Sequence, residues 1–266
     1  MKPEKLTVEE IKLISLQGLK KFHDYCEKNN LRYYLCYGTL LGAVRHKGFI
    51  PWDDDIDVVM PRSDYDALIS QKKLIDSENW ELLSINSEKK YKFPFAKFCN
   101  KDTVYLPSRF KSGLLYGIPI DIFPIDLVSD AYEADELSKK LLRHLISGRV
   151  IFNFDEKIDF IQFCVIYIKS FIKCLLFGTY NNQHIRFHKK MLTKKKGKFY
   201  KCFFAPTKDL WSVEWFGNPK KIQFENEFFN APSDYDQVLK TTYGDYMKLP
   251  PEEERHYTHE IEAYIK

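Results

Sequence analysis

The sequence predicts an α+β protein, with a mixed β-sheet core that is flanked by helices and followed by a helical middle section. Up to about residue 130, short apolar and aromatic segments of strand character alternate with segments of helical spacing. Residues 131–200 keep the helical spacing and lose the strand pattern, and residues 201–266 are rich in aromatic side chains and proline. No internal repeat or low-complexity linker separates these parts, so we expect residues 1–266 to form one domain with its α/β core in residues 1–130.

The first element expected is an amphipathic helix. The segment Thr7-Val8-Glu9-Glu10 has the pattern of a capping box, and apolar side chains follow it at roughly helical spacing as far as Cys26. Glycine and proline then mark the boundaries of shorter elements. The strands expected after this helix are 32–37, 56–60, 80–85, 95–98, 103–106 and 118–122, and the helices expected between them are 39–44 and 63–74.

The composition is that of an ordinary globular protein and argues against several classes of partner. The formal charge is only +4 for 266 residues and the basic residues are widely spread, so charge does not indicate nucleic-acid binding. The six cysteines form no CxxC pair and have no zinc-ligand spacing, which is typical of reduced cysteines. The N-terminus lacks the apolar core of a signal peptide. We therefore expect a cytoplasmic protein that does not bind nucleic acid.

Residues 160–177 complicate this expectation, because they are almost wholly apolar. Their length is near the lower limit for a membrane span, but Lys169 and Lys173 lie four residues apart and give the segment one polar edge. Three interpretations follow: a buried or groove-lining helix, which the lysines favour, a helix on the membrane surface, or a membrane span. The second would make the protein peripheral on the inner face of a membrane.

The most informative segment is Gly38 to Met60, in which a glycine opens a short helix, basic residues follow, and carboxylates then lead into an apolar strand. Alternation along an extended chain places Asp55 and Asp57 on one side and Ile56 on the other. Two carboxylates so close repel each other, which raises at least one pKa unless a cation lies between them. Mg²⁺ takes oxygen ligands and shares them with substrate phosphates. We therefore expect one or two Mg²⁺ ions here, with Mn²⁺ as a substitute.

Asp121 is the best candidate for a third metal ligand. It is the lone acid in Gly117-Ile-Pro-Ile-Asp-Ile-Phe-Pro124, an apolar segment in which an unpaired charge is costly. The alternative is a turn or cap aspartate that precedes Pro124. Asp126, five residues further on, is expected either to orient Asp121 or to cap the next element.

Gly38 and Thr39 lie where a strand gives way to a helix, and exposed backbone N–H groups at such a place can bind phosphate. Arg45 and Lys47 follow them, and the charges of these two residues would neutralise a phosphate group, with Arg45 suited to bidentate contact. The alternatives are an ordinary helix cap for Gly38-Thr39 and a solvated helix end for the two basic residues. We expect His46 to be a packing or loop residue rather than a ligand.

Weaker candidates complete the set. Lys97 is a lysine within an apolar strand, which suits either a diphosphate ligand or an edge-strand lysine. Glu225 is expected to line the site. His256 and His259 are three apart on an expected helix and could share a face, although a solvated face is favoured over a zinc site. Aromatic side chains that could form the wall of a site for a cationic group, none of them assigned to a cage, are Trp52, Tyr116, Trp211 and Trp215.

These motifs resemble those of the LicD family, which includes bacterial phosphocholine transferases and is related to fukutin and fukutin-related protein. The resemblance rests on Gly38 to Val59, on the segment around Asp121, and on the tail Tyr243-Gly-Asp-Tyr-Met-Lys-Leu-Pro-Pro251. Residues 131–200 contribute little to it. The resemblance implies a nucleotidyltransferase-like fold for the core, with residues 201–266 completing the site.

The resemblance also implies roles for single residues. Gly38-Thr39 matches the family's Gly-Gly/Ser element, with threonine in place of serine. Asp55 and Asp57 match its Asp-x-Asp pair, and Asp121 matches its third acid. Asp53 is the first acid of the Trp-Asp-x-Asp-x-Asp run and has a less defined role, while Asp54 is expected to face away.

The activity implied is the transfer of a phosphorylated small group, phosphocholine by default, from a CDP-activated donor to a hydroxyl group, with release of CMP. The acceptor is then a glycan or lipid-linked glycan, such as a precursor of teichoic acid, lipopolysaccharide or capsule. Glycerol- or ribitol-phosphate transfer by the same mechanism is the alternative. Two other classes stay open: a nucleotidyltransferase that adds NMP to a small molecule, protein or RNA, and a non-catalytic nucleotide- or glycan-binding module.

Overall fold

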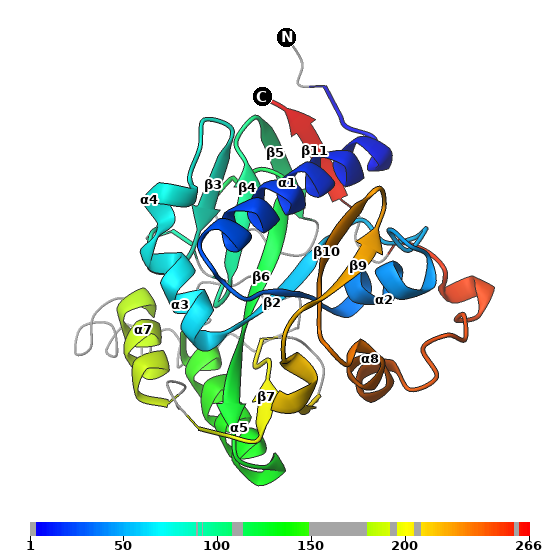
Figure 1. The fold of residues 1–266 in the computed structure, drawn as a ribbon. Coiled ribbons are helices and arrows are strands. Elements are labelled where there is room, and N and C mark those ends of the chain that lie inside the picture. The colour runs from blue at the N-terminus through cyan, green and yellow to red at the C-terminus, as the bar shows by residue number, and fades with distance from the viewer. Residues whose placement is uncertain are drawn as a thin grey trace, which may run out of the picture.

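A mixed sheet of seven strands forms the centre of the protein, which confirms the expected α+β class (Figure 1). The computed structural model describes residues 4–88, 90–91, 93–107, 114–148, 180–191, 196–204, 209–257 and 261–266. The main strand order is β1-β2-β6-β4-β3, and β7 and β8 extend the sheet from the far end of β6. The β2–β6 pair is parallel and the other pairs are antiparallel. The strands are β1 (Tyr34–Leu35), β2 (Asp57–Pro61), β3 (Trp80–Leu83), β4 (Ala96–Asn100), β6 (Pro119–Val128), β7 (Phe199–Lys201) and β8 (Trp211–Ser212).

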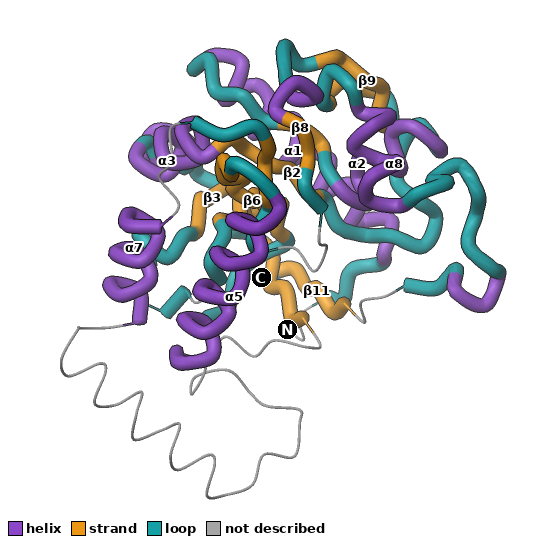
Figure 2. Tube along the Cα trace, turned by 90° about the horizontal axis from the view of Figure 1, so that it is seen from below, coloured by secondary structure: helices purple, strands orange, loops and turns teal. Residues whose placement is uncertain are grey.

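Helices pack around this sheet. α1 begins with the predicted capping box, in which the Thr7 and Glu10 side chains each accept a hydrogen bond from the other residue's backbone N–H. Figure 2 shows α5 and α7 side by side, in agreement with their contacts. The helices are α1 (Val8–Lys28), α2 (Tyr37–Arg45), α3 (Arg62–Ser70), α4 (Lys72–Ile75), α5 (Ala131–Gly148), α7 (Tyr180–Met191), η2 (Val213–Phe216), α8 (Tyr235–Tyr243) and η3 (Glu252–Glu254).

α1 covers one face of the sheet over β4 and β6 (Figure 1). Its approach is close at Gly18, where a Cβ atom would lie 2.4 Å from the Trp80 ring and 3.1 Å from Ile120 Cδ1. Ile120 therefore points toward α1. Because side chains alternate along a strand, Asp121 points to the opposite face of the sheet.

β6 is longer than the predicted strand 118–122, because it continues through Pro124 to Val128. Pro124 pairs with Met60 of β2, whereas the ladder between β4 and β6 has already ended at Ile122. The strand has one neighbour at this point, so the missing N–H of proline leaves no gap in a second ladder. Asp121 consequently lies inside a strand, and its interpretation as a turn or cap residue before Pro124 is wrong.

Two further sheets of two strands use the predicted strand 103–106 and three segments for which the sequence predicted no strand. β9 (Lys220–Phe224) and β10 (Glu227–Ala231) form an antiparallel hairpin, and β10 contacts β1. β11 (Ile261–Ile265) pairs antiparallel with β5 (Thr103–Pro107), which therefore lies outside the central sheet. The last strand is thus joined to the first half of the sequence, and Lys5, near the start of the described chain, forms a bridge with Tyr264 of β11 (Figure 1).

The apolar segment 160–177 lies outside the described residues, so its three interpretations stay predictions. Within the described part of the chain, no helix combines the length and the apolar character that crossing a membrane requires. Four of the six cysteines are described, and all four are buried with free thiols, as expected of small apolar side chains: Cys26, Cys36, Cys99 and Cys202.

Asp126 takes part in a buried ion pair rather than in either role predicted for it. Its two carboxylate oxygens accept hydrogen bonds of 2.7 and 2.8 Å from Nε and Nη2 of Arg62, the first residue of α3. Only 1% of the Asp126 surface is exposed. Because five residues separate Asp126 from Asp121 along β6, the two side chains project from opposite faces. The pair therefore attaches α3 to the sheet.

We expect Asp126→Asn to reduce the free energy of unfolding by about 3–5 kcal/mol, because it leaves the buried Arg62 without its charge partner. Urea denaturation followed by circular dichroism measures the change. Asp135→Asn is the matched control, since Asp135 also pairs with a basic residue, Lys139, but both side chains are about 60% exposed. Equal losses in the two variants would contradict the structural role of the Arg62–Asp126 pair.

Candidate active site

Three charged residues lie in a row across neighbouring strands. Asp57 in β2 and Asp121 in β6 are partners in the parallel ladder, and Lys97 in β4 is the antiparallel partner of Asp121. Adjacent strands are about 4.8 Å apart, so side chains at partner positions project from the same face within reach of one another. We call Lys97, Asp121 and Asp57 the charged row. It lies on the face of the sheet opposite α1.

Asp55 reaches the charged row from the segment that enters β2. The Asp121 backbone N–H donates a 2.9 Å hydrogen bond to the Ile56 carbonyl. The hydrogen-bonded, extended part of this segment therefore begins before Asp57, the first residue of β2. Ile56 is fully buried, and Asp55 and Asp57 alternate to its other side. Burial and then the carboxylates of Asp55, Asp121 and Asp53 raise the pKa of Asp57 well above its usual range. The structure thus brings the three predicted acids, Asp55, Asp57 and Asp121, to one place.

Asp53 lies against the start of α2. A Cβ atom at residue 38 would be 2.3 Å from Asp53 Oδ2, so the absence of a side chain at Gly38 admits this carboxyl group. Burial and the neighbouring Asp55 raise the pKa of Asp53 to about 8. Asp54, which was expected to face away, is also buried, with 4% of its surface exposed.

Thr39 connects α2 to the acids. Its side chain is buried, and its Oγ1 accepts a 2.8 Å hydrogen bond from the backbone N–H of Asp57. The hydroxyl therefore fixes the first residue of β2 relative to the helix. Phosphate binding by Gly38 and Thr39 stays a prediction, and the structure adds that the Asp53 carboxyl group borders the same helix end.

Lys97 is buried, with 5% of its surface exposed, and forms an ion pair with Asp121. Its Nζ also lies 5.0 Å from the ring centroid of Phe93, 5.1 Å from that of Phe95 and 5.6 Å from that of Tyr116. Since β4 lies between β3 and β6, the interpretation of Lys97 as an edge-strand lysine is wrong. The Lys97 ammonium group points to Asp121. A lysine that binds a diphosphate would be expected to point into open space instead.

The basic residues at the end of α2 have unlike surroundings. Arg45 is half-buried, and it donates hydrogen bonds from Nη1 to the Tyr246 carbonyl at 3.0 Å and from Nε to His46 Nε2 at 2.9 Å. His46 packs edge-on against Trp52, with 6.2 Å between ring centroids, as expected of a packing residue. Lys47 is exposed and has a left-handed backbone with φ of 61°.

Glu225, at the turn between β9 and β10, holds the loop that follows α2. Its Oε1 accepts a 2.9 Å hydrogen bond from the Phe49 N–H, and its own N–H donates a 2.7 Å hydrogen bond to the Lys47 carbonyl. A Cβ atom at Gly48 would lie 2.0 Å from Glu225 Oε1, so a glycine is needed there. The prediction that Glu225 lines the site is corrected accordingly: this carboxylate is used to position the loop.

Two of the weaker candidates have surroundings other than those expected for them. His256 follows η3 and is not on a helix, and its Nδ1 lies 2.9 Å from the Glu253 carbonyl oxygen. His259 lies outside the described residues. Trp211 is fully buried against Phe216, so it belongs to the core and is not an aromatic wall.

Two tyrosines near the acids were not predicted as site residues. Tyr243 ends α8 with 41% of its surface exposed, and desolvation on the inner side of its phenol, followed by the nearby Cys36 and Asp57, raises its pKa. Tyr105 lies in β5, and burial and the Asp121 carboxylate raise its pKa. Tyr243 opens the tail motif, so its signal was present in the sequence. Tyr105 is placed by the pairing of β5 with β11, for which no local pattern exists.

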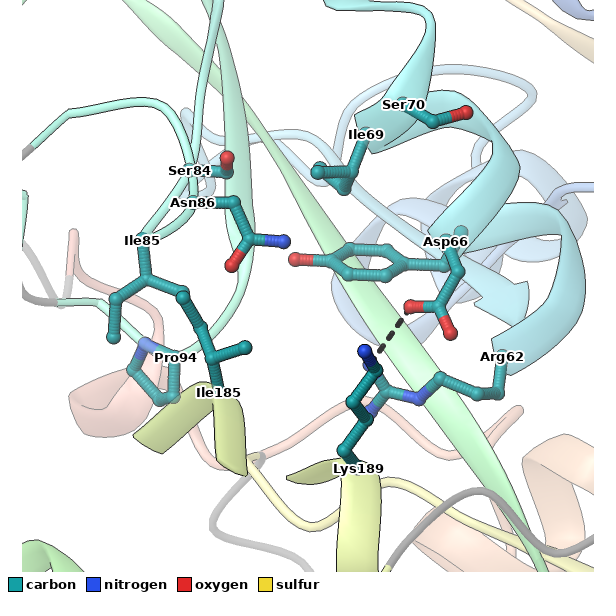
Figure 3. A pocket seen from close by; sticks show the side chains of 11 residues that line it. Arg62, Asp66, Ile69, Ser70, Ser84, Ile85, Asn86, Pro94, Ile185 and Lys189 are labelled. Carbon is teal, nitrogen blue, oxygen red and sulfur yellow. Dashed lines mark ion pairs between the residues drawn. The ribbon is translucent and has the colours of Figure 1, made fainter. Parts of the chain in front are cut away.

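A cavity of about 410 Å³ lies in a different part of the molecule, between α3, the segment 84–94 and α7 (Figure 3). Figure 3 shows Ile85, Pro94 and Ile185 on one side of it and Arg62 and Asp66 on the other. Among the described residues, none of the acids of the charged row lines this cavity. It is therefore not the candidate active site.

Comparison with known proteins identifies the family. Residues 30–154 match the family model described as LicD/FKTN/FKRP, nucleotidyltransferase domain. Over 98% of its length the chain is 30% identical to lipopolysaccharide cholinephosphotransferase LicD of Haemophilus influenzae, and the match covers 99% of that protein. The chain belongs to the LicD family. Shorter matches are 48% identical over 58 residues to an uncharacterized protein of Rickettsia typhi and 50% identical over 54 residues to one of Rickettsia prowazekii, each about a fifth of both chains.

The acids of this LicD-family site suit a divalent cation that a substrate helps to hold. In the part of the chain that the structure describes, no group of three or more His, Cys, Asp or Glu side chains is arranged as a ready-made metal site. Mg²⁺, however, is usually bound by one or two carboxylates together with substrate phosphates and water. Asp55 and Asp57 supply such a pair, and the raised pKa of Asp57 reflects its burial first and then the repulsion of neighbouring carboxylates, which a cation relieves.

Without metal, the raised pKa of Asp53 should make stability fall as the pH rises. The folded protein keeps this proton up to about pH 8, whereas an unfolded aspartate loses it near 3.8. Between these values the folded state binds more protons, so the free energy of unfolding decreases with pH, by at most about 1.4 kcal/mol per pH unit for one proton. We expect the Tm in EDTA to decrease from about pH 6.5 to 8, a range above most histidine titration.

Two variants and one addition test this pH dependence. Asp53→Asn should lose much of the slope, while Asp135→Asn, at an exposed position, should keep the slope of the wild type. Mg²⁺ should flatten the slope, because the cation replaces the proton as the partner of the acids. A wild-type Tm that is constant or increases over this pH range would contradict the prediction.

Proposed function

We propose that the chain transfers phosphocholine from a CDP-activated donor to a hydroxyl of a lipopolysaccharide-type glycan, with Mg²⁺ held at Asp55, Asp57 and Asp121. Membership of the LicD family places the chain among the transferases of phosphorus-containing groups. The relative from Haemophilus influenzae, a lipopolysaccharide cholinephosphotransferase that aligns over nearly its whole length, supports phosphocholine as the transferred group. The observation that carries the mechanism is the partner position of Asp57 and Asp121 in adjacent parallel strands, with Asp55 on the same side.

In the proposed reaction, the acceptor hydroxyl oxygen forms a bond to the phosphorus that carries choline. The bond between that phosphorus and the bridging oxygen of the diphosphate breaks, CMP leaves with the electron pair, and the proton of the hydroxyl group is released to solvent water. A divalent cation, when bound by the acids, supplies charge neutralisation for the diphosphate oxygens.

The chain's own residues hold these acids and provide positive charge beside them. Thr39 and Glu225 fix the two ends of the segment that carries the acids, through hydrogen bonds to the backbone at Asp57 and Phe49. Arg45 is held beside the same segment by the Tyr246 carbonyl and His46. A guanidinium in this position suits a phosphate group of the donor.

Two other activities are weighed against phosphocholine transfer. Glycerol- or ribitol-phosphate transfer uses the same acids and differs only in the head group of the donor. Addition of NMP to a small molecule, protein or RNA is the second candidate, and the description of the matching family model as a nucleotidyltransferase domain favours keeping it.

A CMP-release assay distinguishes these activities. We expect CMP release from CDP-choline, in the presence of Mg²⁺ and a lipopolysaccharide acceptor, to be at least about tenfold faster than from CDP-glycerol or CDP-ribitol, since a tenfold preference needs only about 1.4 kcal/mol of differential binding. EDTA should stop the reaction. Incorporation of label from an NTP into a target, without CMP release from any of the three donors, would instead support nucleotidyl transfer and contradict the proposal.

Removing a predicted metal ligand should abolish most of the activity without unfolding the protein. We expect Asp55→Asn and Asp57→Asn each to lower kcat by at least about 100-fold, because the charge that positions and neutralises the diphosphate is lost. Asp135→Asn, which removes an exposed carboxylate on α5, should retain wild-type kcat. Circular dichroism confirms folding, and full activity in Asp57→Asn would rule out the proposed role of the acids.

A further inference from the structure

The tail motif of residues 243–251 holds two arginine side chains by its backbone carbonyls. The Tyr246 carbonyl accepts a 3.0 Å hydrogen bond from Nη1 of Arg45, and the Pro250 carbonyl accepts a 2.8 Å hydrogen bond from Nε of Arg255. Tyr246 is itself attached to α8, because its hydroxyl donates a 2.8 Å hydrogen bond to an aspartate of that helix. We call Arg45 and Arg255 the guanidinium pair.

The two guanidinium groups lie near one another around the Trp52 ring. The guanidinium carbon of Arg255 lies 5.9 Å from the Trp52 ring centroid. His46 accepts a 2.9 Å hydrogen bond from Nε of Arg45 and packs edge-on against the same Trp52 ring, with 6.2 Å between centroids. Burial lowers the pKa of Arg45; of its neighbours, Tyr243 raises this pKa and the charge of Arg255 lowers it. The fold therefore holds two positive charges together against their repulsion.

The guanidinium pair has hydrogen-bond donors to spare. Among the described residues, no carboxylate forms an ion pair with Arg45 or Arg255, although the exposed glutamates of η3 directly precede Arg255. A guanidinium has five N–H groups. Arg45 uses two and Arg255 uses one in contacts with described residues, which leaves three on Arg45 and four on Arg255. Planar donors of this kind suit an oxyanion such as phosphate, which they bind through two parallel hydrogen bonds.

The guanidinium pair lies at the opposite end of α2 from the acids. Arg45 is the last residue of this helix, whereas Asp53 borders its start at Gly38. The seven helical steps between Gly38 and Arg45 span roughly 10 Å, which an arginine side chain and a diphosphate together can bridge. Tyr243, which affects the pKa of Arg45, is also within reach of the acids, since burial and then charges that include Asp57 raise its own pKa.

The proposed reaction changes the charge of one phosphate group in a way that suits two guanidinium groups. In a CDP-activated donor, the phosphate next to cytidine is esterified on both sides and carries one negative charge. When the bond to the transferred phosphorus breaks, this phosphate keeps the bridging oxygen and gains a second negative charge. Positive groups fixed beside that phosphate therefore interact more strongly with the departing CMP than with the intact donor, which lowers the barrier.

We propose that Arg45 and Arg255 bind the phosphate group of CMP as it leaves, with both side chains positioned by carbonyls of the tail motif. This inference rests on the proposed function, in which CMP is the leaving group. It gives the tail motif a role in the reaction and adds Arg255, a residue that the sequence analysis did not single out, to those that contact the donor.

Binding of CMP and of cytidine to the full-length protein tests the proposal without turnover. In isothermal titration calorimetry with Mg²⁺ present, Arg255→Gln should raise the Kd of CMP at least about tenfold, because charge-assisted hydrogen bonds to the phosphate are lost. Cytidine has no phosphate, so its Kd should not change. Arg255→Lys keeps the charge without the planar donors and should raise the Kd of CMP about threefold.

The matched control is Lys139→Gln, which removes one exposed positive charge from α5 and should leave the Kd of CMP unchanged. Kinetics give a second measurement: Arg255→Gln should lower kcat more than it raises the KM of CDP-choline, because the second charge develops only as the bond breaks. The KM of the lipopolysaccharide acceptor should stay that of the wild type.

Equal CMP affinities in the wild type and Arg255→Gln would overturn the proposal. So would an increase confined to the KM of the acceptor, which would place the guanidinium pair at phosphates of the acceptor instead. If Arg255→Gln does not fold, Arg255→Lys decides, since an unchanged Kd of CMP in that variant contradicts the proposal. Wild-type protein that releases CMP from CDP-choline but does not bind CMP contradicts this inference alone, whereas protein that does neither contradicts the proposed function.

Discussion

Repulsion between carboxylates that are held side by side is the constraint on which this structure depends. Parallel pairing of β2 with β6 brings Asp57 and Asp121 to partner positions, and Asp55 and Asp53 approach from the segment before β2. Burial and these neighbours raise the pKa values of Asp57 and Asp53, so the arrangement costs free energy in the absence of a cation. The contacts that surround these acids keep them in place against this repulsion.

The contacts that hold the acids come from segments distant in the sequence. Thr39 of α2 accepts a hydrogen bond from the first residue of β2, and Glu225 of the β9–β10 turn binds the loop that follows α2. On the opposite face, Arg62 and Asp126 attach α3 to β6. Lys97 compensates Asp121 within the sheet itself. Some of the polar residues that resemble ligands in the sequence thus hold the structure together, whereas others are available for the reaction. This is expected where the needs of function oppose those of stability.

Local patterns predicted the elements that have local causes. The capping box before α1, the glycine-opened helix α2 and the apolar strand after the acids were all expected, with boundaries that differ by a few residues. Two errors have a non-local cause. β6 continues through Pro124 because β4 has already ended, and β11 is a strand because it pairs with β5 in the first half of the chain. β9 and β10, in contrast, form a local hairpin that the sequence analysis missed, and His256 follows the short η3 instead of lying on the helix expected there.

By itself, the sequence determined the family and the acids that belong together, because the spacing of Asp55 and Asp57 and the apolar surroundings of Asp121 follow from chain alternation and from the cost of burying charge. Only the tertiary structure decided which charged residues face them. Lys97 is directed at Asp121 and lies close to three aromatic rings, Asp126 pairs with Arg62 at the start of α3, and Glu225 holds a loop. The physical reason is that strand register and the facing of side chains depend on pairings between segments far apart in the sequence, as for Phe49 and Glu225 at a separation of 176.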